Sequence, residues 1–393
     1  GKVYIFEYSA SSGNWSYVTT LSASDASCSQ RFGADLSMSA THLAISSISS
    51  SAPAQSEGIY VFSTSNWTQI AKITTPSGSS LTDLFGFSVT TFGAYVIAGA
   101  HLGDDRGLSS GGAYVFKWDS GNSNYAQTQS LYPTDAVNAY VGDQFGYSVS
   151  MHDQYLAISS PKDSPSGYET GSVYMFVFNG THWDQDAKIQ ASDGAGGDNF
   201  GACVSVSTLT APMVLVGANY ADHSGSSDLG AAYVFKRVSG SWSQKAKLTP
   251  SEAGDSSYFG ASVDLFASIA VIGARSSDGT NGGNAEGSAY YFQDEGLDDW
   301  QQKRQFKLSN PSNYDYFGTG VAVYETKIVV TADSVDTPST ANIGAGYYFT
   351  GYEVCGNGLI RDPESCDDGN YEDLDGCSGG CSPEQGWSCF LEP

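Results

Sequence analysis

Five of the seven cysteines of this 393-residue chain lie in its last 39 residues. They are Cys355, Cys366, Cys377, Cys381 and Cys389. The segment around them is rich in Gly and Asp and has almost no aliphatic residues, so it cannot bury a core and needs covalent cross-links. Disulfides are therefore predicted. A zinc site is the competing interpretation, but Cys377 and Cys381 have no second close pair, and no histidine lies in the tail.

The odd number of tail cysteines requires a partner from elsewhere, unless one of them stays reduced. Cys28 lies in a loop near the expected closure of the ring described below and could reach the tail. Cys203 lies inside a predicted strand and is expected to be a buried thiol. A cysteine beyond Pro393 or on a neighbouring subunit is the other alternative. The pairing stays open, since four cysteines alone allow three pairings.

Oxygen ligands crowd one loop of the tail: Asp367, Asp368, Asn370, Asp373 and Asp375. Carboxylate and amide oxygens at this density suit calcium better than zinc. A solvated acidic loop is an equally good interpretation of these residues. Calcium is therefore expected as a cofactor only if they form a metal site.

Three N-glycosylation sequons begin at Asn14, Asn66 and Asn179. All three fall in the same predicted turn of a repeating unit, which would place them on one rim of the molecule. On a secretory route, we therefore expect N-glycans at these positions.

Catalytic chemistry finds little support. The five histidines, at positions 42, 101, 152, 182 and 223, stand in unrelated contexts without metal-ligand spacing. No GxSxG, HExxH or phosphate-binding loop occurs. A binding protein is therefore favoured over an enzyme.

Charge and hydropathy exclude two classes of partner. The 42 acidic residues exceed the 17 basic ones and give a formal net charge of −25, which excludes a nucleic-acid binder. No apolar run of 18 residues occurs, so no membrane span is expected in this segment.

The elements that must position these groups follow from a repeat. Phe-Gly recurs at intervals of 53 to 60 residues, at positions 32, 85, 145, 200, 259 and 317, which gives six copies of a repeat. Each copy is followed by an apolar run ending in small residues and by a run that starts with Gly and carries Tyr and Phe, and the Gly run occurs a seventh time at Gly1. A run from an aromatic residue to an aliphatic one occurs six times, first from Trp15 to Leu21 and last from Trp300 to Leu308, which is two residues longer. Four short strands per unit predict an all-β protein, a six- or seven-bladed β-propeller over residues 1–350, followed by a small disulfide-rich module over residues 351–393. In pairs such as Gly99-Ala100, crowding between backbones is expected.

The strand count leaves a remainder. We count 25 strands, whereas six blades need 24 and seven need 28. In a six-blade ring, Trp15 to Leu21 would close the last blade, and Gly1, Lys2, Val3, Tyr4, Ile5 and Phe6 would be left over. The chain starts and stops within a motif, so we expect missing strands to come from further sequence or from another subunit, and an exposed edge invites pairing.

Acidic residues recur in two sets of loops that share one face of a propeller. The first set is Asp104, Asp222, Asp278 and Asp336, and the second is Asp25, Asp135, Asp193 and Glu252. They predict either an acidic contact face or ordinary turn chemistry, and for any single Asp we favour the turn.

FGFSV at 85, FGYSV at 145 and FGASV at 259, with WTQIAKI at 67 and WSQKAKL at 242, resemble the FG-GAP repeat of integrin-type ectodomains and many secreted proteins. The resemblance covers residues 1 to about 350 and implies a recognition propeller. No DxDxDG loop follows the first strands, so an integrin-like calcium site is not expected. In the tail, CGNG, ESCDDGN and DGCSGGC resemble a CDDGN-type cysteine-rich repeat of secreted multidomain proteins.

The sequence thus predicts a non-catalytic extracellular structural or adhesion glycoprotein, a self-assembling subunit of a cell-surface filament or coat. The alternative is a monomeric recognition ectodomain that binds protein or carbohydrate through its loop face. A secreted hydrolase comes third.

Overall fold

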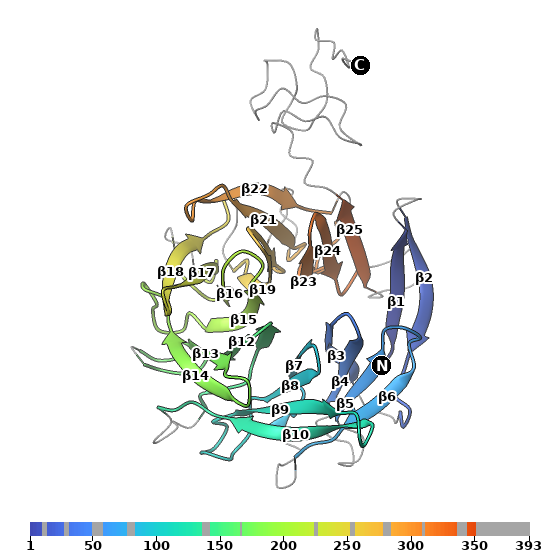
Figure 1. Ribbon diagram of the computed structural model, residues 1–393. Coiled ribbons are helices and arrows are strands. Elements are labelled where there is room, and N and C mark those ends of the chain that lie inside the picture. Colours follow the sequence, from blue (N-terminus) through green and yellow to red (C-terminus); the bar gives the residue numbers. More distant parts are fainter. Residues whose placement is uncertain are drawn as a thin grey trace, which may run out of the picture.

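The computed structural model describes residues 1–9, 14–26, 31–48, 58–76, 83–135, 142–165, 167–223, 227–251, 256–277, 284–308, 311–335 and 344–350. These residues form 25 β-strands and no α-helix. The sheets are arranged around a common axis as the blades of a propeller (Figure 1). The all-β propeller is confirmed.

Six blades each contain one of the six repeated Phe-Gly pairs, in or just before their first strand, and continue as an antiparallel meander in chain order. Five have four strands. They are β3 (Arg31–Met38), β4 (His42–Ile48), β5 (Gly58–Ser63) and β6 (Gln69–Ile73); β7 (Ser88–Phe92), β8 (Tyr95–Ala100), β9 (Gly112–Asp119) and β10 (Asn124–Leu131); β11 (Val149–His152), β12 (Tyr155–Ser160), β13 (Ser172–Phe178) and β14 (Trp183–Ile189); β15 (Phe200–Ser207), β16 (Met213–Ala218), β17 (Ala231–Val238) and β18 (Ser241–Leu248); and β19 (Phe259–Phe266), β20 (Ile269–Ala274), β21 (Ser288–Asp294) and β22 (Trp300–Phe306). The sixth has three: β23 (Phe317–Tyr324), β24 (Lys327–Ala332) and β25 (Ala345–Thr350).

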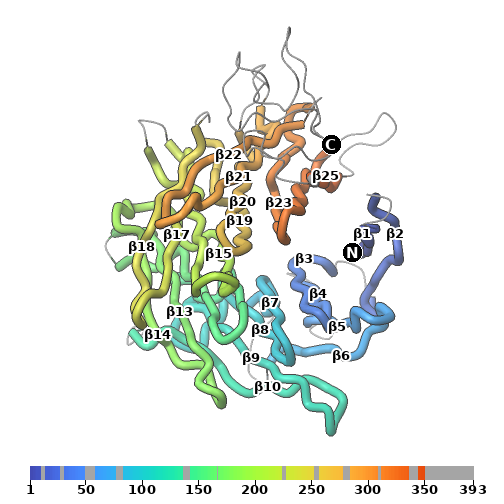
Figure 2. Tube along the Cα trace, turned by 45° about the horizontal axis from the view of Figure 1, so that its top comes forward, coloured from blue at the N-terminus to red at the C-terminus, as the bar shows by residue number. Residues whose placement is uncertain are grey.

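The remaining two strands, β1 (Val3–Ser9) and β2 (Asn14–Leu21), form a sheet of their own. They pair from Val3 with Leu21 to Ser9 with Asn14. The expected closure of the last blade by Trp15 to Leu21 is therefore not found, because β2 pairs with β1, and β25 is paired only with β24 among the described residues. Figure 2 shows β1 and β2 at the outside of the ring between β25 and β6, with β3 and β23 as the nearest inner strands.

Small residues allow the blades to approach closely, as expected. A Cβ added to Gly99 would lie 2.0 Å from the carbonyl oxygen of Gly146 in the next blade, and one added to Gly217 would lie 1.9 Å from that of Gly260. No side chain fits at such distances.

The last fourth strand is shorter than expected. β22 ends at Phe306 rather than at Leu308, and Phe306 pairs with Ala289 as Leu248 pairs with Ala232. An aromatic residue therefore takes the buried place that the other blades give to an aliphatic one, with the same six-residue spacing from the Trp.

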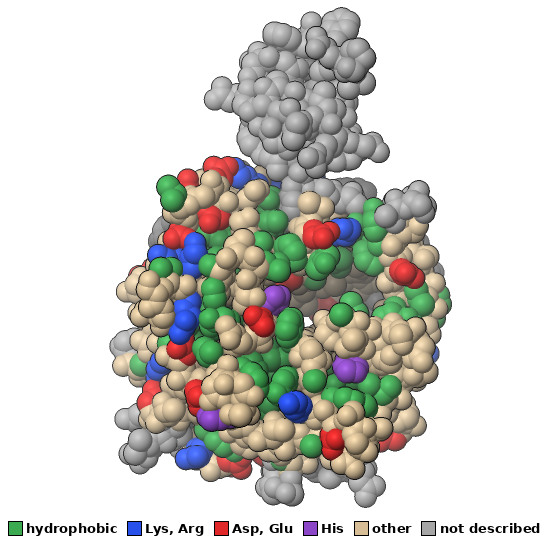
Figure 3. Space-filling model, viewed as in Figure 1, with side chains coloured by type: hydrophobic (Ala, Val, Ile, Leu, Met, Phe, Trp, Pro, Cys, Tyr) green, Lys and Arg blue, Asp and Glu red, His purple; other side chains and the backbone are tan. Residues whose placement is uncertain are grey.

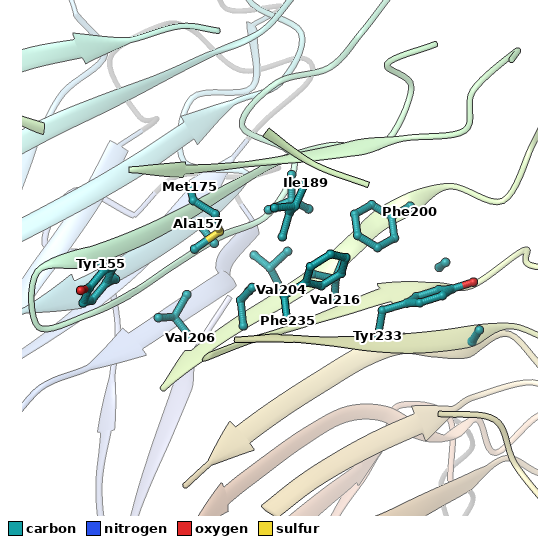
Figure 4. Packing of buried hydrophobic residues seen from close by; sticks show 14 of the residues in the cluster. Tyr155, Ala157, Met175, Ile189, Phe200, Val204, Val206, Val216, Tyr233 and Phe235 are labelled. Carbon is teal, nitrogen blue, oxygen red and sulfur yellow. The ribbon is translucent and has the colours of Figure 1, made fainter. Parts of the chain in front are cut away.

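The core lies between the blades. One cluster joins Ala157 and Met175 of one blade to Val204, Val216 and the aromatic residues of the next (Figure 4). Five further clusters repeat this arrangement around the ring. Burial of apolar surface between neighbouring blades thus stabilises the propeller.

Candidate assembly surface

An aromatic contact recurs in all six blades. The Phe of the Phe-Gly pair is buried and contacts a Tyr and a Phe of the third strand of its own blade, edge-on in all pairs except the tilted pair of Phe85 and Tyr114. Phe145 lies 5.5 Å from Tyr174 and 6.3 Å from Phe176 between ring centroids. The other sets are Phe32 with Tyr60 and Phe62, Phe85 with Tyr114 and Phe116, Phe200 with Tyr233 and Phe235, Phe259 with Tyr290 and Phe292, and Phe317 with Tyr347 and Phe349.

The sheet of β1 and β2 carries the same Tyr and Phe, but no Phe from a Phe-Gly pair lies against them among the described residues. Tyr4 and Phe6 stand three and five residues after Gly1, as Tyr174 and Phe176 stand after Gly171. Tyr4 is 58% exposed and Phe6 is 53% exposed, whereas Tyr174 and Phe176 are each 2% exposed. Phe6 lies against Tyr17 of β2 instead, at 5.9 Å. We call this two-stranded sheet the half-blade.

Contacts on both sides fix the half-blade in the ring. A Cβ added to Gly1 would lie 1.9 Å from the carbonyl oxygen of Phe32, as one added to Gly171 would lie 2.1 Å from that of Phe200. On the other side, Tyr348 of β25 contacts Tyr8 at 5.4 Å. The half-blade therefore occupies a blade position between β23–β25 and β3–β6, with third and fourth strands only.

A belt of side chains joins the first strands of successive blades. Within the described part of the chain, no strand pairs with the inner edge of a first strand, so the backbone N–H groups there need other acceptors. At five interfaces between blades, a side chain of one first strand accepts a hydrogen bond from a backbone N–H of the first strand in the next blade. The accepting residue stands five positions after the Phe of its own Phe-Gly pair, and the donating residue stands six positions after the Phe of the next pair. The pairs are Ser37 with Thr91, Thr90 with Met151, Ser150 with Val206, Ser205 with Leu265, and Asp264 with Val323.

The belt stops at the half-blade. The corresponding residue of the sixth first strand is Ala322, which has no acceptor. On the following blade, Leu36 is 50% exposed and Met38 is 63% exposed, although Val149 and Met151 at the same places are 7% and 6% exposed. The belt was not predicted from the sequence, although the six Phe-Gly copies, aligned, show the polar position in five of them and its loss in the sixth.

Four apolar side chains thus face the inner part of the half-blade position: Tyr4, Phe6, Leu36 and Met38. We call them the half-blade surface. Figure 3 shows the molecule hollowed between the β23–β25 blade and β3, with apolar side chains around the hollow. On the outer side, Trp15, Tyr17 and Val18 of β2 are 40%, 57% and 38% exposed.

Two half-buried Asp residues lie in the first strands, Asp35 in β3 and Asp264 in β19. Asp35 accepts hydrogen bonds from the backbone N–H groups of Val89 (2.6 Å) and Leu36 (2.9 Å). Burial outweighs these bonds and raises the pKa of Asp35 to about 6. Burial likewise raises the pKa of Asp264. No cation pairs with either carboxylate among the described residues, so both serve as hydrogen-bond acceptors between blades.

The acidic loop residues that the structure describes hold the fold together. Lys72 pairs with Asp25 at 2.6 Å, and Lys247 pairs with Asp193 at 2.6 Å. Lys188 pairs with both Asp135 and the buried Asp163, each at 2.7 Å. Asp104 and Asp222 accept backbone N–H groups within their own turns, from Ser109 and Asp228. Turn chemistry and ion pairing therefore account for them; Glu252, Asp278 and Asp336 lie outside the described residues.

The three sequons lie in the hairpins between third and fourth strands, as expected. Asn14 begins β2, Asn66 precedes β6 and Asn179 precedes β14, and all three are exposed. The Thr68 hydroxyl donates to the Asn66 side-chain oxygen at 2.7 Å, and the Thr181 hydroxyl donates to that of Asn179 at 2.8 Å. Glycosylation at these positions stays a prediction.

Cys203 lies in β15 and, within the described part of the chain, is a free thiol. Burial raises its pKa to about 11, so it is a neutral, unreactive thiol at pH 7. Cys28, the five tail cysteines and the proposed calcium ligands from Asp367 to Asp375 lie outside the described residues. Among the residues that are described, no three His, Cys, Asp or Glu side chains gather as metal ligands would.

Burial affects the protonation of three histidines. Burial lowers the pKa of His101 to about 4, where its ring lies 4.1 Å from Phe87. The pKa of His152 and of His223 is also lowered by burial. These environments keep the three imidazoles neutral at pH 7.

Comparison with known families agrees with this geometry. The FG-GAP repeat matches residues 67–116, 125–178, 183–235 and 242–292, which is more than half of the chain. The chain belongs to the FG-GAP repeat family. FG-GAP repeats are typical of extracellular and cell-surface proteins, and an FG-GAP propeller is a fold of adhesion and recognition domains.

Residues 345–382 match a domain of unknown function (DUF4215). This match overlaps β25 and extends into the tail; the CDDGN-type assignment and the disulfides stay predictions. No curated protein matches the FG-GAP chain. Within its described residues, no helix is long and apolar enough to cross a membrane.

Proposed function

We propose that this FG-GAP protein is a non-catalytic structural or adhesion glycoprotein of the cell surface, and that it is a subunit of a filament or coat assembled through the half-blade surface. One observation carries the proposal. Tyr4, Phe6, Leu36 and Met38 are 50–63% exposed, whereas the equivalent residues of the complete blades are at most 8% exposed. Adjacent apolar side chains at such exposure mark an interaction surface.

Backbone geometry supports the same surface. The edge of β1 opposite β2 has no paired strand among the described residues. Free backbone donors and acceptors beside an apolar surface favour pairing with another chain. The sequons lie on the hairpins at one end of the blades, so glycans there would leave the inner edge of β1 accessible.

The protein purified in calcium without reductant should therefore form filaments or ordered arrays by electron microscopy, with a mass above one chain of 41.4 kDa. The variant Tyr4→Ser/Phe6→Ser should shift the mass towards the monomer. The matched control is Tyr168→Ser/Leu209→Ser, which removes two apolar side chains that are 75% and 50% exposed elsewhere. Monodisperse wild-type particles near 41 kDa plus glycan would overturn the assembly.

A recognition ectodomain is the second candidate, because a groove of about 650 Å³ lies between the β7–β10 and β11–β14 blades. Arg106, Gln129, Tyr132, Trp183 and Gln185 are among its lining residues. The Arg106 guanidinium lies 4.8 Å from the Tyr132 ring, so a cation and an aromatic face are both present for a carbohydrate or peptide. Binding in a glycan or peptide array that Arg106→Ala abolishes, in a monomeric protein, would favour this alternative.

A further inference from the structure

We propose that Asn179 is the site of a second modification: in chains without a glycan at this position, its side chain closes a succinimide with the backbone nitrogen of Gly180, and water converts the succinimide to isoaspartate and aspartate. The inference goes beyond the proposed function and does not depend on it. Of the three sequons, this one alone has a glycine after the asparagine, because Asn14 and Asn66 are each followed by a tryptophan.

The attacking group is the backbone nitrogen of Gly180. Its N–H donates no hydrogen bond within the described part of the chain. Gly180 lies at a φ of 100° in an exposed turn, and a Cβ added to it would meet nothing within 4 Å. The nitrogen is therefore unpaired and unshielded, and ring closure displaces no neighbouring group.

The attacked group is the side-chain amide of Asn179, whose oxygen is surrounded by donors. Oδ1 accepts the backbone N–H groups of Thr181 at 2.9 Å and of His182 at 3.0 Å. The Thr181 hydroxyl donates to the same oxygen at 2.8 Å. Attack on Cγ moves negative charge onto Oδ1, where these three donors are already placed to stabilise it. The folded turn therefore promotes the step.

The leaving nitrogen, Nδ2 of Asn179, is held on the other side of the amide. It donates to the Asp184 carboxylate at 2.7 Å. The His182 ring lies beside it, with Nε2 at 2.9 Å from Nδ2 and at 2.9 Å from a carboxylate oxygen of Asp184. These contacts fix the orientation of the amide, so that its oxygen faces the three donors.

The reaction balances with water as the single co-reactant. The bond between Gly180 N and Asn179 Cγ forms, the bond between Cγ and Nδ2 breaks, and Nδ2 leaves as ammonia with the proton of the Gly180 N–H. Water then opens the imide at the side-chain carbonyl to give aspartate, or at the backbone carbonyl to give isoaspartate. N-glycosylation uses the same Nδ2 atom, so a deamidated chain has lost the acceptor of the glycan.

Asn66 provides a comparison within the same molecule. Its Oδ1 also accepts a backbone N–H and a hydroxyl, both from Thr68, at 3.1 and 2.7 Å. The nitrogen that follows it differs, because the Trp67 N–H donates to the Ser63 carbonyl oxygen at 2.9 Å. That nitrogen is engaged and belongs to a bulky residue. Asn66 should therefore stay intact under conditions that convert Asn179.

The test uses the full chain produced in cells that attach no N-glycans, incubated in mildly alkaline buffer made with oxygen-18 water. Peptide mass spectrometry should find a labelled acid at Asn179 and none at Asn66, and protein isoaspartate methyltransferase should modify the same peptide. Gly180→Ala should suppress the conversion. Thr181→Val removes one donor from Oδ1 and should slow it about threefold to tenfold. Thr68→Val, the same change beside Asn66, is the matched control and should leave the rate at Asn179 unchanged.

A synthetic peptide of residues 177–184, VFNGTHWD, separates the effect of the fold from that of the Asn-Gly pair itself. The folded chain should convert at least as fast as this peptide. A folded chain that stays intact while the peptide converts would overturn the inference, because the turn would then protect Asn179. Equal conversion at Asn66, or a wild-type rate in Thr181→Val, would overturn it as well. Filament formation is measured separately, so the proposed function stands or falls independently of these outcomes.

Discussion

Tyr4 and Tyr174 occupy the same position of their strands, three residues after a glycine, but Tyr174 is 2% exposed against Phe145 and Tyr4 is 58% exposed. The Tyr174 hydroxyl also donates to Asp163 at 3.1 Å. One sequence pattern therefore produces a buried residue in one sheet and an exposed residue in another. What differs is whether a Phe-Gly strand lies beside it.

The two tyrosines should respond differently to the same substitution. Tyr174→Ser removes a buried ring and its contact with Phe145, so we expect the free energy of unfolding to fall by about 3–5 kcal/mol. Tyr4→Ser in the isolated chain should change it by less than about 0.5 kcal/mol. Urea unfolding followed by circular dichroism measures both. Equal losses would show that Tyr4 is packed within the chain, which would contradict its role in binding.

The belt predicts a loss of stability from an isosteric change. Thr90 is 5% exposed, and its hydroxyl accepts the Met151 N–H at 3.1 Å. Thr90→Val leaves that buried N–H without its acceptor, so we expect a loss of about 1–3 kcal/mol in the free energy of unfolding. Thr74→Val, at an exposed position, is the matched control and should change it little. Equal effects of the two substitutions would show that the belt contributes nothing.

The sequence predicted the blades well because their signals are local. A Phe-Gly pair, a run ending in small residues and a Tyr/Phe run each report the packing of one strand, and 25 strands were expected and found. The half-blade was not predicted because Gly1 to Phe6 reads like every other third strand. Whether inner strands lie beside it depends on neighbours that the local pattern does not contain.

Other features depend on contacts distant in sequence. Asp25 and Lys72 are 47 residues apart, and neither position alone distinguishes an ion pair from an acidic face. Phe306 was missed because an aliphatic residue was sought at the end of the strand, whereas the site requires only an apolar side chain. The belt was within reach, since a polar residue follows five of the six Phe-Gly pairs at the same distance.

Asp35 predicts a pH dependence with a definite sign. Because its pKa is raised to about 6 from an ordinary value of 3.8, the folded state binds more protons than the unfolded state between these values. Its contribution to stability therefore falls as pH rises through this window. His101, with its pKa lowered to about 4, contributes the opposite slope. Comparing wild type with Asp35→Asn cancels His101, and the variant should gain about 1–3 kcal/mol relative to wild type between pH 4 and pH 7.

Urea unfolding at half-unit steps of pH measures this difference. A difference between Asp35→Asn and wild type that stays constant across this range would show that Asp35 is not the acid with a raised pKa that the structure describes.

Cys203 leads to a prediction about the whole cysteine set. Seven cysteines are present, and with Cys203 as a half-buried free thiol six remain, which is an even number. If all the others are paired within these 393 residues, Cys28 is the sixth partner of the five tail cysteines. The native protein should react with Ellman's reagent far more slowly than the unfolded chain, because the pKa of the half-buried Cys203 thiol is raised to about 11 and keeps it protonated. After unfolding in urea without reductant, one thiol per chain should react. Alkylation and peptide mass spectrometry should find the label on Cys203 alone. Label on Cys28 would place the partner of the odd tail cysteine outside these 393 residues, and a second reactive thiol in the tail would contradict complete disulfide pairing of the module.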